Sequence, residues 1–68
     1  MRVTISKMLK GFIEGYENKS AFCERFDVDP ASVSRYLAGE GVSAAFIGRM
    51  LYATGLVFEK AFVIEEKD

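Results

Sequence analysis

The sequence predicts a small all-α domain: a compact bundle of four to five helices, followed by a short C-terminal tail or an edge strand. Three observations lead to this prediction. Apolar residues recur at helical spacing in successive segments, and helix-capping residues and glycines separate one segment from the next. The 68 residues are half hydrophobic, with six Phe and three Tyr, which is enough for one modest core. Residues 1–68 are therefore expected to form a single domain.

The first helix is expected over residues 4–16. Its apolar residues repeat every three or four positions, which is the pattern of one buried helix face. They are Ile5, Met8, Leu9, Phe12, Ile13 and Tyr16. Thr4 is expected to cap the start of this helix, and Gly15 lies near its end.

The second helix is expected over residues 19–26, with Asn18 as its N-cap. Its inner face consists of Phe22, Cys23 and Phe26. A break follows at Asp27 and Val28. Asp tolerates left-handed backbone better than most residues, although less well than Gly, so it is compatible with a turn at this point.

The third helix is expected over residues 30–38. Asp29 is a preferred N-cap, and Pro30 suits the first helical position because the N–H that proline lacks has no helical partner there. The inward residues are Val33, Tyr36 and Leu37. Gly39 and Gly41 are expected to end the helix.

Ser43 is expected to cap a fourth helix over residues 44–54, which Gly55 closes. Its apolar positions are Phe46, Ile47, Met50 and Leu51. Residues 56–62 are predicted to form a short fifth helix, with a strand as the alternative. Residues 63–68 are expected to form an edge strand or a tail.

The composition argues against an enzyme, a metal protein or a cofactor-binding protein. The chain has no histidine, so it lacks the most common general base and metal ligand, and its single cysteine, Cys23, cannot form an internal disulfide. Cys23 is interpreted as a small buried helix residue. No apolar run approaches the ~18 residues of a membrane span, and no signal peptide precedes the first helix. We expect a cytoplasmic protein of bacterial or phage origin with no membrane or small-molecule partner.

The segment NKSAFCERFDVDPASVSRYLAGE, residues 18–40, resembles the helix-turn-helix of the lambda-repressor/Cro-like (C1-type) regulators. The resemblance rests on a small residue at Cys23, an apolar residue at Val28, the run Val33-Ser34-Arg35-Tyr36 and the closing Gly39. It covers roughly residues 18–62, because FIGRMLYATGLVFEKAF is similar to the fourth and fifth helices of the family, and the combination of VSRYLAGEG with this segment resembles small repressors of actinobacteria and their phages. The resemblance implies a central helix-turn-helix, with a second helix at about 19–26 and a recognition helix at about 30–38, that binds double-stranded DNA.

Two departures from this family pattern involve acidic residues. Asp27 replaces the turn glycine and places a negative charge near the DNA. The third helix begins with Asp29, Pro30 and Ala31 where the family has Gln, Arg or Asn, so long base-reading side chains are missing from its first turn. Both departures are compatible with weak or shape-dependent DNA binding, and also with a helix-turn-helix that serves another purpose.

The outward residues of the third helix are the predicted base-reading set, because a recognition helix presents them to the major groove. They are Pro30, Ala31, Ser32, Ser34, Arg35 and Ala38. Arg35 matches guanine O6 and N7, the alternative being a solvated charge or a pair with Glu40. Ser32 and Ser34 can donate to bases or phosphates, or can be ordinary surface serines. Pro30 and Ala31 can contact a thymine methyl group, or can simply be small enough for close approach.

Two residues outside the third helix are predicted to contact phosphates. Lys19 lies at the first turn of the second helix, where the resemblance and the helix N-terminus both suit an anion. Ser43, with the backbone beside it, is expected to reach the next phosphate. The alternative for Lys19 is a solvated lysine.

The charge balance is unfavourable for one protomer alone. Residues 1–58 carry seven Lys and Arg against six Asp and Glu, and residues 59–68 carry two against four, which gives the net charge of -1. A monomer is expected to bind DNA weakly, and a homodimer on a pseudo-palindromic site would double the contacts. The apolar C-terminal residues, with an edge strand at 61–65, are a candidate for the dimer interface, the alternative being that all of them are core.

A transcriptional repressor that occupies an operator is the leading functional hypothesis. One alternative is a protein-interaction module of the antitoxin or anti-repressor type, which the weak basic balance favours. Another is an architectural or recombination accessory protein that binds DNA without controlling a promoter. A fold alone does not distinguish these three functions.

Overall fold

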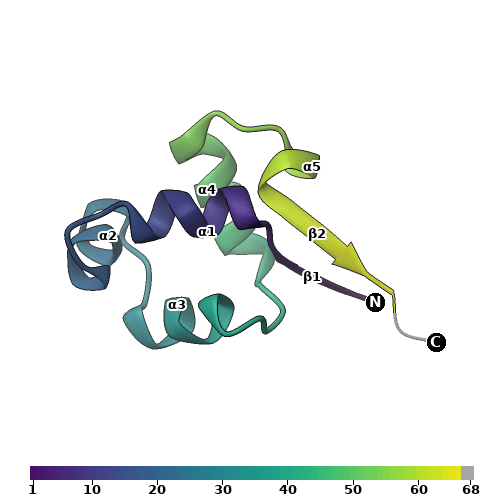
Figure 1. Ribbon diagram of the computed structural model, residues 1–68, viewed down its shortest axis with the longest axis horizontal. Coiled ribbons are helices and arrows are strands. Elements are labelled where there is room, and N and C mark those ends of the chain that lie inside the picture. Colours follow the sequence, from purple (N-terminus) through teal and green to yellow (C-terminus); the bar gives the residue numbers. More distant parts are fainter. Residues whose placement is uncertain (67–68) are drawn as a thin grey trace.

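Five helices and one two-stranded antiparallel sheet make up residues 1–66, the part of the chain that the computed structural model describes (Figure 1). The helices pack around a shared core, and the two strands lie side by side at one end of the molecule. The prediction of a small, compact and mostly helical domain is confirmed. The sheet departs from the all-α prediction. In chain order the elements are β1 (Arg2–Ile5), α1 (Lys7–Glu14), α2 (Lys19–Phe26), α3 (Pro30–Leu37), α4 (Ala44–Thr54), α5 (Phe58–Ala61) and β2 (Phe62–Glu65).

The N-terminal segment differs from its prediction, because residues 2–5 form a strand. Thr4 does not cap α1 but lies within β1, where it is 5% exposed. Ser6 is the actual cap, and its hydroxyl oxygen accepts the N–H of Leu9 at 3.1 Å. Met8, expected on the buried face, is 53% exposed. Pairing with β2 holds Arg2–Ile5 extended, and this pairing overrides the helical periodicity of the segment.

The three central helices begin where their capping residues predict. The side chains of Asn18, Asp29 and Ser43 accept backbone N–H groups three residues further on, at 2.7, 3.0 and 3.2 Å. The third helix ends at Leu37, one residue earlier than predicted, and Ala38 is its C-cap. Gly39 follows with φ of 99°, a backbone conformation that glycine adopts without steric cost.

The core is built from both aromatic and aliphatic side chains of all five helices and of β2. Its buried members are Leu9, Ile13, Phe22, Cys23, Val33, Tyr36, Phe46, Met50, Ala61 and Phe62. One aromatic cluster joins α1 to α2, with ring centroids of Phe12 and Phe26 6.0 Å apart. A second joins α3 to α4, with Tyr36 and Phe46 4.6 Å apart. These contacts fix α3 against the rest of the molecule and leave its opposite side uncovered.

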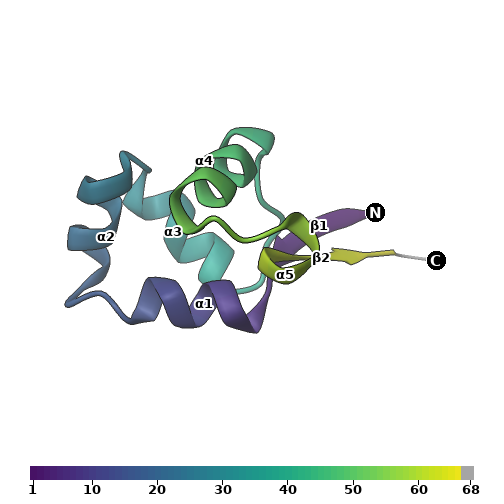
Figure 2. The ribbon, with the colours of Figure 1, turned by 90° about the horizontal axis from the view of Figure 1, so that it is seen from above.

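The sheet brings the two ends of the described chain together. Arg2 pairs with Glu65 and Ile5 with Phe62 in an antiparallel register (Figure 1). The loop between α3 and α4 contacts β1, because the N–H of Val42 donates to the carbonyl of Val3 at 2.8 Å. Seen from above, the strand pair extends away from the helices (Figure 2).

The C-terminal segment contains both of the elements considered for it. Helix α5 is shorter than the predicted helix over residues 56–62, because Phe62 already begins β2. The edge-strand interpretation of the following residues is confirmed up to Glu65, and residues 67–68 lie outside the described part. No helix among residues 1–66 is both long enough and apolar enough to cross a membrane.

Candidate functional site

A short turn, Asp27–Asp29, joins α2 to α3 and sets the angle between the two helices. Asp27 adopts left-handed backbone with φ of 54°, and the N–H of Val28 donates to the carbonyl of Cys23 at 3.0 Å. Cys23 is 3% exposed and Val33 is fully buried, so the two helices are packed against the core and each other through small or branched side chains. This packing leaves the opposite side of α3 exposed to solvent.

The outer side of α3 is a surface of small and polar side chains with one arginine. Its members are the six residues that the sequence assigned to base contacts: Pro30, Ala31, Ser32, Ser34, Arg35 and Ala38. Five of them are exposed, and Ser32 is half-buried. This set is called the α3 face below. Its alanines, serines and proline leave the helix backbone close to the molecular surface.

A chain of hydrogen bonds runs along the α3 face from Asp29 to Arg35. The carboxylate of Asp29 accepts the N–H and the hydroxyl of Ser32, at 3.0 and 3.1 Å. The hydroxyl oxygen of Ser32 in turn accepts Nη2 of Arg35 at 3.1 Å. Arg35 is therefore linked to the N-cap of its own helix rather than to Glu40. The link leaves Nε and the other guanidinium nitrogen available to a ligand.

Lys19 connects α2 to the α3 face. Its ammonium group donates to the hydroxyl oxygen of Ser34, and both residues are exposed. Lys19 is the first residue of α2, so its charge lies beside N–H groups of the first helical turn, which have no partner within the helix. The structure thus brings together a lysine, a helix N-terminus and the α3 face.

Ser43 lies on another side of the site, at the start of α4. Its hydroxyl oxygen accepts the N–H of Phe46 at 3.2 Å and lies 3.5 Å from the hydroxyl of Tyr36. A shallow groove of about 190 Å³ connects Ser43 with Ser32 and so with the α3 face. The groove is lined by Asp27, Val28, Asp29, Ser32, Tyr36, Ser43, Ala45, Phe46 and Arg49.

Arg49 of α4 is a site residue that the sequence reasoning missed. Its guanidinium lies 3.9 Å from the carboxylate of Asp27 and donates to the carbonyl of Phe26 at 3.4 Å. It also borders a second hollow of about 480 Å³ beside Tyr52, which is 94% exposed. No local pattern reveals Arg49, because it reaches the turn from a helix outside the α2–α3 pair.

Two acidic residues reduce the positive charge of the site. Asp27 and Asp29 both line the groove, together with Arg49.

Burial raises the pKa of the Cys23 thiol, while Lys19 lowers it and Asp29 raises it further. The raised pKa disfavours the thiolate, which is the nucleophilic form of cysteine. Residues 1–66 contain no cluster of side chains suited to a metal ion.

No protein-family model, curated protein or solved structure matches this chain.

Proposed function

We propose that this chain is a sequence-specific DNA-binding protein, with α2 and α3 as a helix-turn-helix of the lambda-repressor/Cro-like type, and that it represses transcription by occupying an operator. The single observation that carries the proposal is the α3 face. It is mostly exposed and made of small side chains, and it presents one arginine whose guanidinium donates a hydrogen bond to Ser32 of the same helix.

The dimensions of α3 suit a major groove. An α-helix with its side chains is about 10–12 Å in diameter, and the major groove of B-DNA is about 12 Å wide, so a helix with small side chains on its exposed side fits inside. The small residues at the helix start allow the backbone to approach the base edges closely. In this arrangement Arg35 reads a guanine through O6 and N7, and Pro30 and Ala31 contact thymine methyl groups.

Lys19 and Ser43 supply the phosphate contacts in this proposal. Lys19 holds a positive charge beside the N-terminus of α2, where the helix dipole also favours an anion. The Ser43 oxygen already accepts the N–H of Phe46, but its hydroxyl proton is available for a phosphate oxygen. Contacts of this kind set the position of α3 on the duplex and carry no sequence information.

Two protomers bind together in this proposal. One protomer neutralises few phosphates, because the basic residues at the α3 face and the adjoining groove are Lys19, Arg35 and Arg49, and the carboxylates of Asp27 and Asp29 line the same groove. A pseudo-palindromic site with half-sites about 34 Å apart doubles these contacts. The homodimer binds double-stranded DNA without a cofactor and is nucleoid-associated in the cytoplasm of a bacterial host.

A protein-interaction module of the antitoxin or anti-repressor type is the second candidate. The observation that favours it is the pair of carboxylates, Asp27 and Asp29, at the groove beside the α3 face. Carboxylates repel phosphates but suit a basic partner surface. An architectural or recombination accessory protein is the third candidate, and it differs from a repressor in binding DNA of any sequence.

Titration of labelled duplexes tests the proposal. The duplexes come from DNA flanking the gene of this protein, with shuffled sequences of equal composition as competitors, at several salt concentrations. Arg35→Ala is expected to weaken binding to the preferred duplex by about 5- to 150-fold, because a bidentate arginine–guanine contact contributes about 1–3 kcal/mol. It should also reduce the preference over shuffled DNA.

Two further variants separate base reading from a general loss of charge. Lys19→Ala is expected to weaken binding to all duplexes alike and to lower the salt dependence. Lys60→Ala removes the same charge from an exposed position of α5, outside the α3 face, and should change affinity less than about twofold. Equal binding to every sequence would favour the architectural function. Absence of binding at low salt would favour the interaction module.

A further inference from the structure

We propose that Ser32 is a positioning residue for sequence recognition: it holds the guanidinium of Arg35 in the orientation that reads a guanine, and it does not contact a base itself. The inference rests on the proposed function, because it requires the α3 face to enter a major groove. It goes beyond that function by giving Ser32 a role in specificity that acts through Arg35.

The hydroxyl of Ser32 is a donor and an acceptor at the same time. It donates its proton to the carboxylate of Asp29 at 3.1 Å, and its oxygen accepts Nη2 of Arg35, also at 3.1 Å. A serine hydroxyl has one proton, so the contact with Asp29 leaves none for a base or a phosphate. We therefore expect Ser32 to act on DNA indirectly.

Asp29 fixes the direction of the Ser32 hydroxyl. The same carboxylate oxygen accepts the backbone N–H of Ser32 at 3.0 Å, so the helix cap and the hydroxyl contact share one anchor. An ionised acceptor keeps the hydroxyl proton on its own side, which leaves the lone pairs of the oxygen to Arg35, and hydrogen bonds in such a chain strengthen one another. Ser32 is also half-buried, which limits the movement of its side chain.

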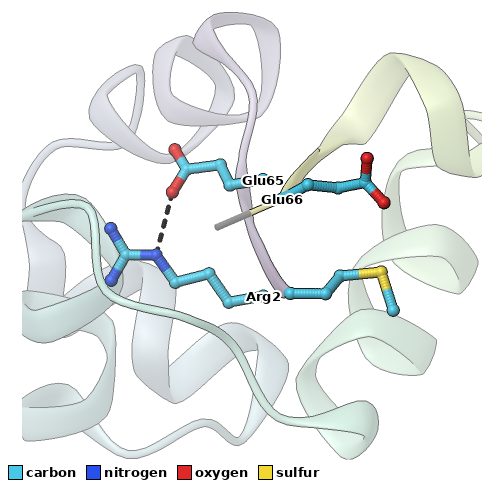
Figure 3. A pocket seen from close by; sticks show the side chains of 4 residues that line it. Arg2, Glu65 and Glu66 are labelled. Carbon is cyan, nitrogen blue, oxygen red and sulfur yellow. Dashed lines mark hydrogen bonds and ion pairs between the residues drawn. The ribbon is translucent and has the colours of Figure 1, made fainter. Parts of the chain in front are cut away.

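The tether on Arg35 is uncharged, unlike the partner of Arg2. Nε of Arg2 lies 2.8 Å from a carboxylate oxygen of Glu65, so its positive charge is paired directly (Figure 3). Among the described residues Arg35 forms no such ion pair, and the Ser32 hydroxyl stands between it and Asp29. The guanidinium is thus restrained while its charge stays available to a ligand.

The tether directs Arg35 toward the start of α3. Ser32 lies three positions before Arg35, one helical turn nearer to the N-terminus of the helix. A recognition helix presents its N-terminal end to the base edges, and here that end carries the small residues Pro30 and Ala31. The restrained guanidinium therefore lies along the part of α3 that approaches the bases most closely.

The tether leaves a complete pair of donors on Arg35. A guanidinium has two edges that offer paired N–H groups, Nε with Nη2 and Nη1 with Nη2. Nη2 contributes a different hydrogen to each edge, and Ser32 accepts only one of them. Whichever hydrogen Ser32 takes, the other edge keeps both donors, and that edge matches O6 and N7 of guanine.

Restraint of Arg35 in the free protein reduces the entropy that is lost on binding. Arginine has one of the largest rotamer entropies among side chains, and fixing its guanidinium on a base removes part of it. Immobilising a side chain of this kind on binding lowers affinity by about 2- to 10-fold, and this is the effect we expect Ser32 to prevent.

The restraint is measurable without DNA, by NMR relaxation of the Nε–H group of Arg35. Its motion should increase in Ser32→Ala and stay near the wild-type level in Ser32→Thr, which keeps a hydroxyl. The Nε–H group of Arg2, bound to Glu65, is the internal control and should not change. Thermal stability should change little, because Asp29 still accepts the backbone N–H at position 32. Equal motion of Arg35 in wild type and Ser32→Ala would overturn the inference.

A double-mutant cycle on DNA tests the effect on specificity. Ser32→Ala is expected to weaken binding to the preferred duplex by about 2- to 10-fold and to reduce the preference over shuffled DNA. Its salt dependence should stay the same, because no charge is removed. In an Arg35→Ala background the same substitution should change affinity less than about twofold, since its target is gone. Ser32→Thr should restore the wild-type preference.

The outcomes separate this inference from the proposed function. Sequence-dependent binding that Ser32→Ala leaves unchanged, or weakens equally with and without Arg35, would overturn the inference and leave the proposed function standing. A wild-type protein that binds every duplex equally, or none, would overturn the proposed function and the inference together.

Discussion

Asp27 adopts left-handed backbone, a conformation that is uncommon for residues other than glycine. It is the only non-glycine residue among residues 1–66 with positive φ, and it occupies the turn between α2 and α3. Its carboxylate is 94% exposed and lies 3.9 Å from Arg49, a distance at which an exposed ion pair contributes little. The residue therefore stabilises the turn mainly through the tolerance of Asp for left-handed backbone.

We predict that Asp27→Gly raises the free energy of unfolding by about 0.5–1 kcal/mol, because glycine adopts this φ without a Cβ clash. Asp27→Ala should lower it, since alanine keeps the clash and lacks the local tolerance of Asp. Urea denaturation of the three proteins is the measurement. An order of stability other than Gly, Asp, Ala would contradict this account of the turn.

At the level of elements, the starts of α2, α3 and α4 were predictable, whereas the start of α1 and the pairing of β1 with β2 were not. The caps Asn18, Asp29 and Ser43 act on N–H groups three residues away, so a short window of sequence contains the whole interaction. Strand β1 depends on β2, with Arg2 and Glu65 separated by 63 positions. A local helical pattern at residues 4–16 could not reveal that partner. Arg49 escaped prediction for the same reason.

Two substitutions of Asp29, the N-cap of α3, separate the effect of helix capping on stability from the effect of the negative charge. Asp29→Ala should cost about 1 kcal/mol of unfolding free energy, because the N–H of Ser32 loses its acceptor. Asp29→Asn keeps an acceptor and should stay within about 0.5 kcal/mol of the wild type. If the α3 face binds DNA, Asp29→Asn should also bind more tightly, because a negative charge is gone. Thermal unfolding and duplex titration of both variants measure the two effects.

In the molecule as a whole, one buried core contains side chains of α1, α2, α3, α4, α5 and β2. Cys23 lies in this core and is 3% exposed. A thiol in this position becomes accessible only when the core opens.

The net charge of the whole chain, -1, says little about function, because the charge of a local surface, and not the total charge, determines how a charged partner is steered.

Cys23 is expected to report the opening of the core. Reaction with an aromatic disulfide reagent should be at least about 100-fold slower in buffer than in denaturant.

Because burial raises the folded-state pKa of the Cys23 thiol, the unfolded chain loses this proton at lower pH than the folded protein. The stabilising contribution is thus present below the ordinary thiol pKa and is lost as pH rises through the folded-state value.

The matched control for the pH dependence is Cys23→Ala. Wild-type stability should fall more steeply than that of the variant as the pH is raised from about 8 to about 10.5, measured by urea denaturation. Parallel curves for the two proteins would contradict a thiol kept neutral by burial.

The pairing of β1 with β2 also has a consequence for biosynthesis. Arg2–Ile5 leave the ribosome well before their partner Phe62–Glu65, because Arg2 and Glu65 are 63 positions apart. Until Phe62–Glu65 have been translated, Val3 and Ile5 have no strand to pair with, whereas α1 to α4 can already assemble. The sheet should therefore form only after Phe62–Glu65 have emerged from the exit tunnel, later than the helices that precede them.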